Sequence, residues 1–112
     1  MIIETSAIIA ILLGEPEAAD FIDAILDAPA ARMSAATYVE AAVVVDANRD
    51  PVLSARFDEL AAEIEVVPIT RDHADTARQA YRDDGRCTGH PSRLNLGDCF
   101  SYALARASGE PL

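Results

Sequence analysis

The sequence contains no lysine, because all nine of its basic residues are arginine. P-loop NTPases hold phosphate with a lysine, and Schiff-base enzymes need a lysine amine. Both classes are therefore excluded. Receiver-type phosphoacceptor domains also place acids at strand ends, but they pair these acids with a lysine. A phosphatase or phosphoacceptor domain is therefore the least favoured alternative.

The chain also lacks a long apolar run, and its first residues lack the basic region typical of a signal peptide. No segment approaches the roughly 18 apolar residues of a membrane helix, and the first charged side chain is Glu4 rather than a basic residue. We therefore expect a cytoplasmic protein. The chain has two cysteines, Cys87 and Cys99, without CxxC spacing. Free thiols are expected in that compartment, and a thiolate zinc site is not.

The acidic balance limits the possible partners. The net charge of −10 argues against non-specific binding of nucleic acid. The charge is uneven, because residues 71–93 contain five of the nine arginines and four acids. This stretch is the only place where a polyanion would be tolerated without a metal ion.

The order of sequence patterns predicts one α/β domain. At 112 residues, the chain has the length of a single domain. Short apolar runs at 1–4, 31–33 and 65–69 alternate with longer helical patterns, which predicts a parallel sheet with helices on its faces. Helices are expected at 5–13, 16–26, 35–48, from 51 onward, 71–83 and 97–108. Their expected caps and stops are Thr5 or Ser6, Gly14, Ser34, Asp50, Thr70 and Gly109.

Three acids stand apart from the solvated acids on helix faces. Glu4 ends the first apolar run, Glu40 lies on an apolar helix face, and Asp98 begins the last helix. Helix starts that follow parallel strands share one edge of the sheet. Two carboxylates about 4 Å apart repel by roughly 4 kcal/mol at an effective dielectric of 20. Without a lysine, such a cluster needs a counter-ion, and oxygen ligands favour Mg²⁺ or Mn²⁺.

Plainer explanations remain open for two of these acids. Glu40 could extend from the rim of an apolar face to solvent, because burying an unpaired carboxylate is costly. Asp98 could simply interact with the positive end of the helix dipole. The two histidines, His73 and His90, are expected at the surface rather than in a metal site.

Three segments together resemble the PIN-domain ribonucleases of the VapC toxin type. They are Met1-Ile2-Ile3-Glu4-Thr5-Ser6-Ala7, Ser34-Ala35-Ala36-Thr37-Tyr38-Val39-Glu40 and Leu94-Asn95-Leu96-Gly97-Asp98-Cys99-Phe100-Ser101-Tyr102-Ala103-Leu104-Ala105. The closing Gly109-Glu110-Pro111-Leu112 is similar to the family's lead into its last strands. The resemblance implies a three-layer α/β/α PIN-like fold with a central parallel sheet, as a single domain over residues 1–112 that is C-terminally incomplete.

The resemblance also implies a chemistry. A Mg²⁺-dependent (or Mn²⁺-dependent) endoribonuclease toxin would hydrolyse RNA phosphodiesters with a metal-activated water. By position, Glu4, Glu40 and Asp98 would be the catalytic, metal-binding acids, and Ser6 would orient ligand or water.

Further residues and partners follow from the same resemblance. Asn95 and Thr5 would support the metal-binding acids from outer positions. Independently of the resemblance, the arginine-bearing stretch 71–93 is the candidate for contact with the RNA backbone, with Arg86 and Arg93 as the residues to test. Its arginines could instead pair with acids on their own helix, namely Asp72, Asp75, Asp83 and Asp84. The implied partners are RNA, a second copy in a homodimer and a cognate VapB-type antitoxin.

The chain departs from the family pattern in two places. Glu4 stands where the family has aspartate, and the extra methylene shifts the carboxylate by roughly 1 Å, which can cost on the order of 100-fold in rate. The family also continues beyond Leu112 into another strand and usually a fourth acid. The alternative is therefore a catalytically impaired PIN domain that acts mainly as an antitoxin-binding partner.

Overall fold

The computed structural model describes residues 1–16, 18–27, 30–84 and 96–109. Its elements, in order, are α1 (Thr5–Leu13), α2 (Ala18–Asp27), β1 (Arg32–Ser34), α3 (Ala35–Asp46), α4 (Pro51–Ala62), β2 (Glu65–Val67), α5 (Arg71–Asp84) and α6 (Leu96–Ser108). The predicted alternation of short strands with longer helices is confirmed. No helix within these ranges is long and apolar enough to cross a membrane.

The sheet is parallel, as predicted, and has two strands within the described residues. β1 and β2 pair in parallel register from Arg32 opposite Glu65 to Ser34 opposite Val67. The first apolar run joins β1 only through a parallel bridge between Ile2 and Arg32. The strand expected over residues 1–4 is therefore reduced to a single bridged residue, Ile2.

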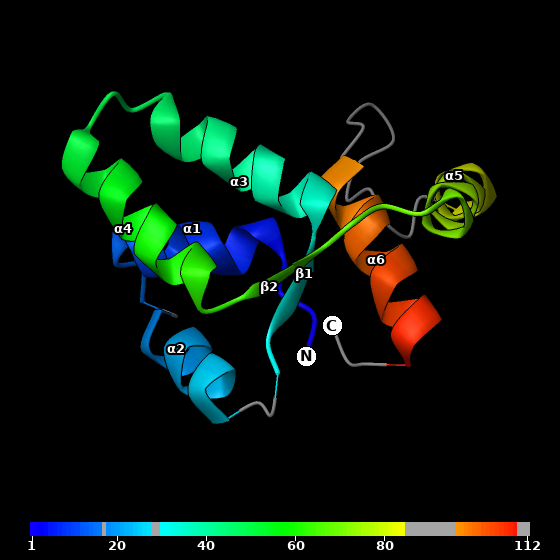
Figure 1. Cartoon of the computed structure of the whole chain (residues 1–112), viewed down its shortest axis with the longest axis horizontal. Helices are drawn as coiled ribbons and strands as arrows, with labels where there is room; N and C mark the ends of the chain where they lie inside the picture. Colours follow the sequence, from blue (N-terminus) through cyan, green and yellow to red (C-terminus); the bar gives the residue numbers. More distant parts are fainter. Residues whose placement is uncertain (17, 28–29, 85–95, 110–112) are drawn as a thin grey trace.

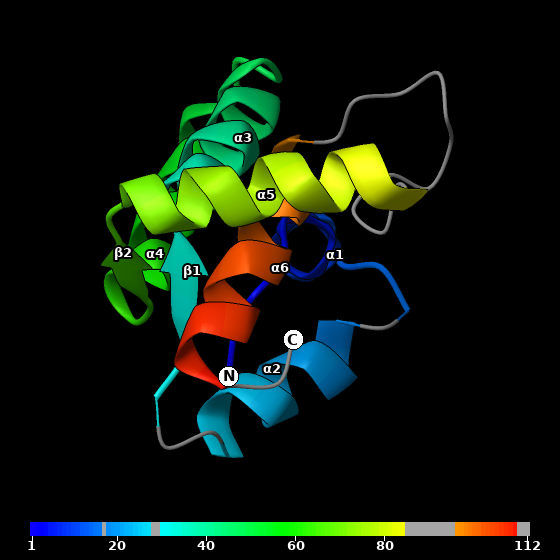
Figure 2. The same ribbon diagram turned by 90° about the vertical axis from the view of Figure 1, so that its right-hand side faces the viewer.

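Helices enclose the strands on both sides. In Figure 1, β1 and β2 run between α1, α2 and α4 on one side and α5 and α6 on the other, and Figure 2 shows the same arrangement from the side. The main core joins α1, β1, α3 and α4 and has Ile8, Met33 and Ala41 fully shielded from solvent. A second core cluster joins α5 to α6 through Ala77, Ala80 and Ala103 together with Cys99.

Most helix ends follow from local side-chain chemistry. The Ser34 hydroxyl accepts a hydrogen bond from the Ala36 amide at 3.2 Å, and the Asp50 carboxylate accepts from the amides of Val52 and Leu53. The Thr70 hydroxyl likewise accepts from the His73 amide at 3.1 Å. These three predicted caps are confirmed.

The first helix begins differently from the prediction. Its N-cap is Glu4, with extended backbone and no capping hydrogen bond from its side chain, whereas Thr5 already belongs to the helix. The expectation that Thr5 or Ser6 caps α1 is therefore wrong. Gly14 ends α1 as predicted, with φ of 65°, a conformation that costs glycine little because it has no Cβ.

Two apolar faces are more exposed than the sequence pattern suggests. On α2, Ile25 packs against the main core, but Ile22 and Leu26 keep 40% and 76% of their surface exposed. On α5, Ala77 and Ala80 are buried as expected, whereas Tyr81 is 45% exposed. Tyr81 is therefore not buried with the other residues of the predicted apolar face of α5.

The cysteine prediction is wrong. Cys99, in the first half of α6, is disulfide-bonded and 2% exposed. The other cysteine of the chain, Cys87, lies outside the described residues. In the structure, Cys99 is therefore not a free thiol.

Candidate functional site

The candidate site lies where three helices begin near the carboxyl end of β1. α1 follows the Ile2 bridge directly, α3 follows β1 without a break, and α6 contacts both α3 and β1. Figures 1 and 2 show the first turns of α1, α3 and α6 close to this end of β1. The topology therefore gathers the three helix starts at one edge of the sheet, where the helix dipoles favour anionic groups.

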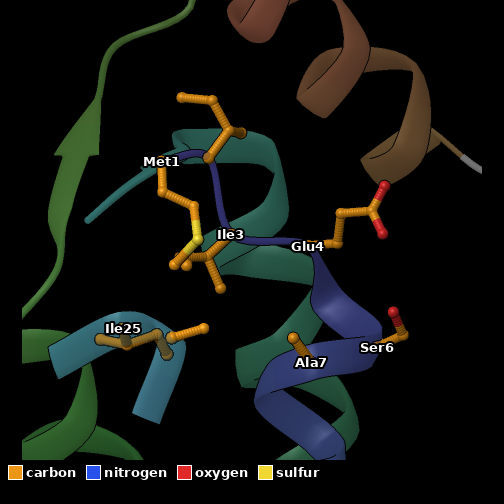
Figure 3. A pocket seen from close by; sticks show the side chains of 8 residues that line it. Met1, Ile3, Glu4, Ser6, Ala7 and Ile25 are labelled. Carbon is orange, nitrogen blue, oxygen red and sulfur yellow. The ribbon is translucent and has the colours of Figure 1, made fainter. Parts of the chain in front are cut away.

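Glu4 and Ser6 reach this edge from the start of α1. Glu4 is half-buried and Ser6 is exposed. In Figure 3 their side chains point to the same side, away from the apolar side chains of Met1, Ile3 and Ile25. Both residues line the rim of a pocket of about 130 Å³ whose remaining lining is largely apolar. The described lining of this pocket comes from residues 1–7 and from α2 and includes no residue of α3 or α6, so the pocket is not the place where the three candidate acids would meet.

Glu40 lies in the second turn of α3. It is half-buried, although Thr37, one turn earlier, and Ala41 beside it are fully shielded from solvent. Its neighbours Val43 and Val44, which the sequence placed on the same apolar face, are 63% and 44% exposed, so that face is partly open to solvent. The structure thus agrees with an acid at the rim of an apolar face, which is compatible both with a ligand role and with the plainer alternative.

Asp98 lies in the first turn of α6, and its side chain is outside the described part of the structure. Its backbone position is one helical turn before Ser101, which is completely buried. Three other predicted site residues, Asn95, Arg86 and Arg93, also lie outside the described residues. Their predicted roles are therefore neither supported nor opposed by the structure.

The structure does not by itself assemble a metal centre. Among the side chains that it describes, no three from histidine, cysteine, aspartate and glutamate gather closely enough to hold a metal ion. Asp98 is not among those side chains, so the expected set of three acids is untested. The carboxylates of Glu4 and Glu40 and the Ser6 hydroxyl are oxygen donors of the kind that Mg²⁺ and Mn²⁺ prefer.

One buried polar atom supports a ligand at this edge. The Thr5 hydroxyl oxygen is shielded from solvent and has no hydrogen-bond partner within the described ranges. It directly follows Glu4 in the chain. Buried hydroxyls in folded proteins are normally satisfied by protein, water or ligand, so an orphaned one beside a site acid fits a bound hydrated cation.

One polar contact near the site was not predicted from the sequence. The hydroxyls of Thr37 on α3 and Ser101 on α6 lie 2.9 Å apart, and both residues are completely buried. The sequence showed only that each of these hydroxyl residues lies within an otherwise apolar helix segment. Sequence periodicity could not pair the two residues, because they are 64 positions apart.

The sequence and the fold define the class together. The model of the PIN domain family matches residues 1–112, the whole chain. Ribonuclease VapC28 of Mycobacterium tuberculosis is 54% identical over 114 aligned residues, which cover 100% of this chain and 86% of that protein. Ribonuclease VapC42 from the same species is 47% identical, with 87% of its length covered.

Solved structures agree on the fold. The toxin VapC20 of M. tuberculosis superposes with a TM-score of 0.72 at 16% identity, over 97% of this chain and 83% of that one. A toxin–antitoxin complex from Klebsiella pneumoniae gives a TM-score of 0.74 at 19% identity, over 99% and 82%. At such identities the likeness concerns the fold alone.

This chain is a PIN-domain protein, and the predicted α/β fold with its parallel sheet is confirmed. Within that class it belongs to the VapC ribonucleases of toxin–antitoxin systems. The family is generally metal-dependent, in agreement with the oxygen-donor chemistry at the candidate site.

Proposed function

We propose that this chain is a Mg²⁺-dependent or Mn²⁺-dependent endoribonuclease toxin that hydrolyses RNA phosphodiesters with water. The observation that carries the proposal is the meeting of α1, α3 and α6 at the carboxyl end of β1. Each of these helix starts brings one candidate acid, and the chain belongs to the VapC ribonucleases. The net charge of −10 disfavours the approach of an RNA phosphate to the candidate acids unless a cation offsets their charge.

The residues divide the work by position. Glu4, Glu40 and Asp98 would hold the cation with carboxylate oxygens, and the exposed Ser6 hydroxyl would orient a phosphate oxygen or the attacking water. When bound, the cation supplies a lowered pKa for water and neutralises charge on the leaving oxygen. The buried Thr5 hydroxyl, next to Glu4 in the chain and without a hydrogen-bond partner among the described residues, would support these acids from an outer position.

Cleavage of RNA with and without divalent cation tests the proposal. Purified protein should cut RNA in Mg²⁺ or Mn²⁺ and lose all activity in EDTA. Asp98→Asn should also abolish cleavage, because an amide is a poorer ligand for a hard cation than a carboxylate. The readout is the rate of fragment formation on a gel.

A matched control separates loss of a ligand from loss of a helix-dipole partner. Asp72 occupies the first turn of α5, as Asp98 does in α6, and it is exposed. Asp72→Asn should leave the cleavage rate unchanged within about two-fold, since surface substitutions change stability by roughly 0.5 kcal/mol or less. Unchanged cleavage in Asp98→Asn would remove Asp98 from the site and contradict the proposed chemistry.

A protein partner is the second part of the proposal. A related fold has been solved as a toxin–antitoxin complex, and the chain belongs to a toxin family. We infer that a cognate VapB-type antitoxin binds this chain in the cytoplasm and blocks the acidic site, and that the chain forms a homodimer. Size-exclusion chromatography of the co-expressed pair should give one complex that does not cut RNA.

An alternative function rests on Glu4. If the longer side chain displaces the carboxylate too far, the chain would act mainly as an antitoxin-binding partner with little turnover. Co-purification of a tight antitoxin complex, with no RNA cleavage in Mg²⁺ or Mn²⁺ by free wild-type protein but cleavage restored in Glu4→Asp, would favour this alternative. Metal-dependent cleavage by the wild-type chain would exclude it.

A further inference from the structure

We propose that the buried hydrogen bond between Thr37 and Ser101 is a positioning device that fixes α3 against α6 and thereby aligns Glu40 with Asp98. The inference rests on the proposed metal site and names residues that set its geometry. The two hydroxyl oxygens are 2.9 Å apart. Both residues are 0% exposed.

The bond lies one helical turn from each acid. Thr37 precedes Glu40 by three residues on α3, and Ser101 follows Asp98 by three residues on α6. Residues three apart are neighbours along one side of a helix, and a helical turn rises about 5.4 Å. A shift of α6 along α3 at the level of Ser101 would therefore carry the Asp98 backbone with it.

The bond also joins two separate apolar clusters. α3 packs into the main core through Ala41 and Val45, whereas α6 packs with α5 through Cys99 and Ala103. Apolar burial is favourable in many relative placements because it has no direction. A hydrogen bond weakens steeply when its angle or distance changes, so the hydroxyl pair selects one register between the two clusters.

Packing alone gives no reason for hydroxyls at these positions. Valine has nearly the shape of threonine, and alanine would fill most of the volume of serine. A buried polar pair that is fully satisfied adds uniqueness of arrangement to a core. At this position, a unique arrangement matters because mutation of the outer groups that orient metal ligands typically lowers metal affinity 10- to 100-fold.

The test measures Mn²⁺ dissociation constants by electron paramagnetic resonance, alongside thermal unfolding. The variant Thr37→Val/Ser101→Ala removes both hydroxyls and leaves no buried polar atom unpaired, so its stability should stay close to wild type. Its affinity for Mn²⁺ should nevertheless fall about ten-fold. Thr37→Ser keeps the hydroxyl and should bind Mn²⁺ within about two-fold of wild type, since the ligands and the hydrogen bond both remain.

A matched control removes a hydroxyl elsewhere on the same helix. The Ser108 hydroxyl donates to the Leu104 carbonyl at 2.8 Å within α6, so Ser108→Ala should leave Mn²⁺ affinity unchanged. Ser101→Ala alone is the second variant should the double variant not fold, and it too should weaken Mn²⁺ binding.

The outcomes separate this inference from the proposed function. Wild-type affinity for Mn²⁺ in the double variant, or in folded Ser101→Ala, would overturn the positioning role and leave the metal site intact. Absence of Mn²⁺ binding by the wild-type chain would overturn the metal site and the positioning role together. Weak binding in Thr37→Ser as well would show that the lost methyl, not the hydrogen bond, is responsible, and would also overturn it.

Discussion

Glu4 is the candidate site residue about which both the structure and the family resemblance give information. It occupies the N-cap of α1, yet its side chain makes no capping hydrogen bond to the helix. In Figure 3 the carboxylate instead extends to the same side as Ser6, away from the apolar pocket lining. Glu4 therefore does not cap α1 with its side chain, and its role in holding a cation stays a prediction.

Shortening this side chain should raise activity. Glu4→Asp withdraws the carboxylate by roughly 1 Å towards the position that the family's aspartate occupies, and misplacement of that size can cost on the order of 100-fold in rate. We expect faster RNA cleavage at saturating Mg²⁺, by up to about two orders of magnitude. Single-turnover kinetics of a defined RNA would measure it.

The control for this change is Glu15→Asp, which shortens an exposed acid just beyond α1 and should have no effect on cleavage. A slower rate in Glu4→Asp than in wild type would mean that the site has adapted to the longer side chain.

Polar side chains show which roles could be predicted from the sequence. Ser34, Asp50 and Thr70 cap helices through amides two or three residues away, so short-range patterns found them. Thr37 and Ser101 act on each other over 64 positions. No local pattern contains that pairing, because it depends on how α3 and α6 pack.

At the scale of elements, α4 supports the helix that carries Glu40. Phe57 on α4 is 2% exposed, and its ring centroid lies 5.6 Å from that of Tyr38 on α3. Phe57→Ala should lower the free energy of unfolding by about 3–5 kcal/mol, through lost burial and the cavity that remains. Urea denaturation would measure the change.

Val52 offers the matched control on the same helix. It is 61% exposed, so Val52→Ala should change the free energy of unfolding by about 0.5 kcal/mol or less. A loss of less than about 1 kcal/mol in Phe57→Ala would contradict the assignment of α4 to the core.

Element positions were predicted better than element contacts. The periodicity of α4 correctly placed Leu53, Phe57 and Leu60 against the core. The same kind of pattern on α2 failed for Ile22 and Leu26, which are largely exposed. A helical stripe says which residues share a face, but whether another element covers that face is decided by the rest of the fold.

At the scale of the molecule, the acidic charge shapes how RNA can bind. With a net charge of −10, attraction of the RNA backbone depends on local basic groups and bound cations. On α5, Arg71 already pairs with Asp75 at 3.2 Å, as the alternative for these arginines expected. The two arginines named from the sequence for RNA contact, Arg86 and Arg93, lie outside the described residues.

Replacing both candidates tests the RNA path. Arg86→Ala/Arg93→Ala should weaken RNA binding and reduce the slope of log affinity against log salt by about 1.4, at roughly 0.7 per phosphate contact for a single strand. Fluorescence anisotropy at several salt concentrations would measure it. The control Arg71→Ala should leave the slope unchanged, and an unchanged slope in the double variant would remove both arginines from the RNA path.

The overall fold was predictable because local sequence patterns show the alternation of strands and helices. The family motifs also occur in the expected order along the chain. The domain limits expected from the sequence and the joint role of Glu4, Glu40 and Asp98 stay predictions. The structure places the three helix starts at one edge, but the Asp98 side chain that would complete the set lies outside its described part.

The most direct test of the central claim is an anomalous difference map from crystals of the wild-type chain grown with Mn²⁺. The account predicts a peak at the carboxyl end of β1, about 2.0–2.3 Å from carboxylate oxygens of Glu4, Glu40 and Asp98. A fully occupied Mn²⁺ elsewhere, with no density among these acids, would contradict it.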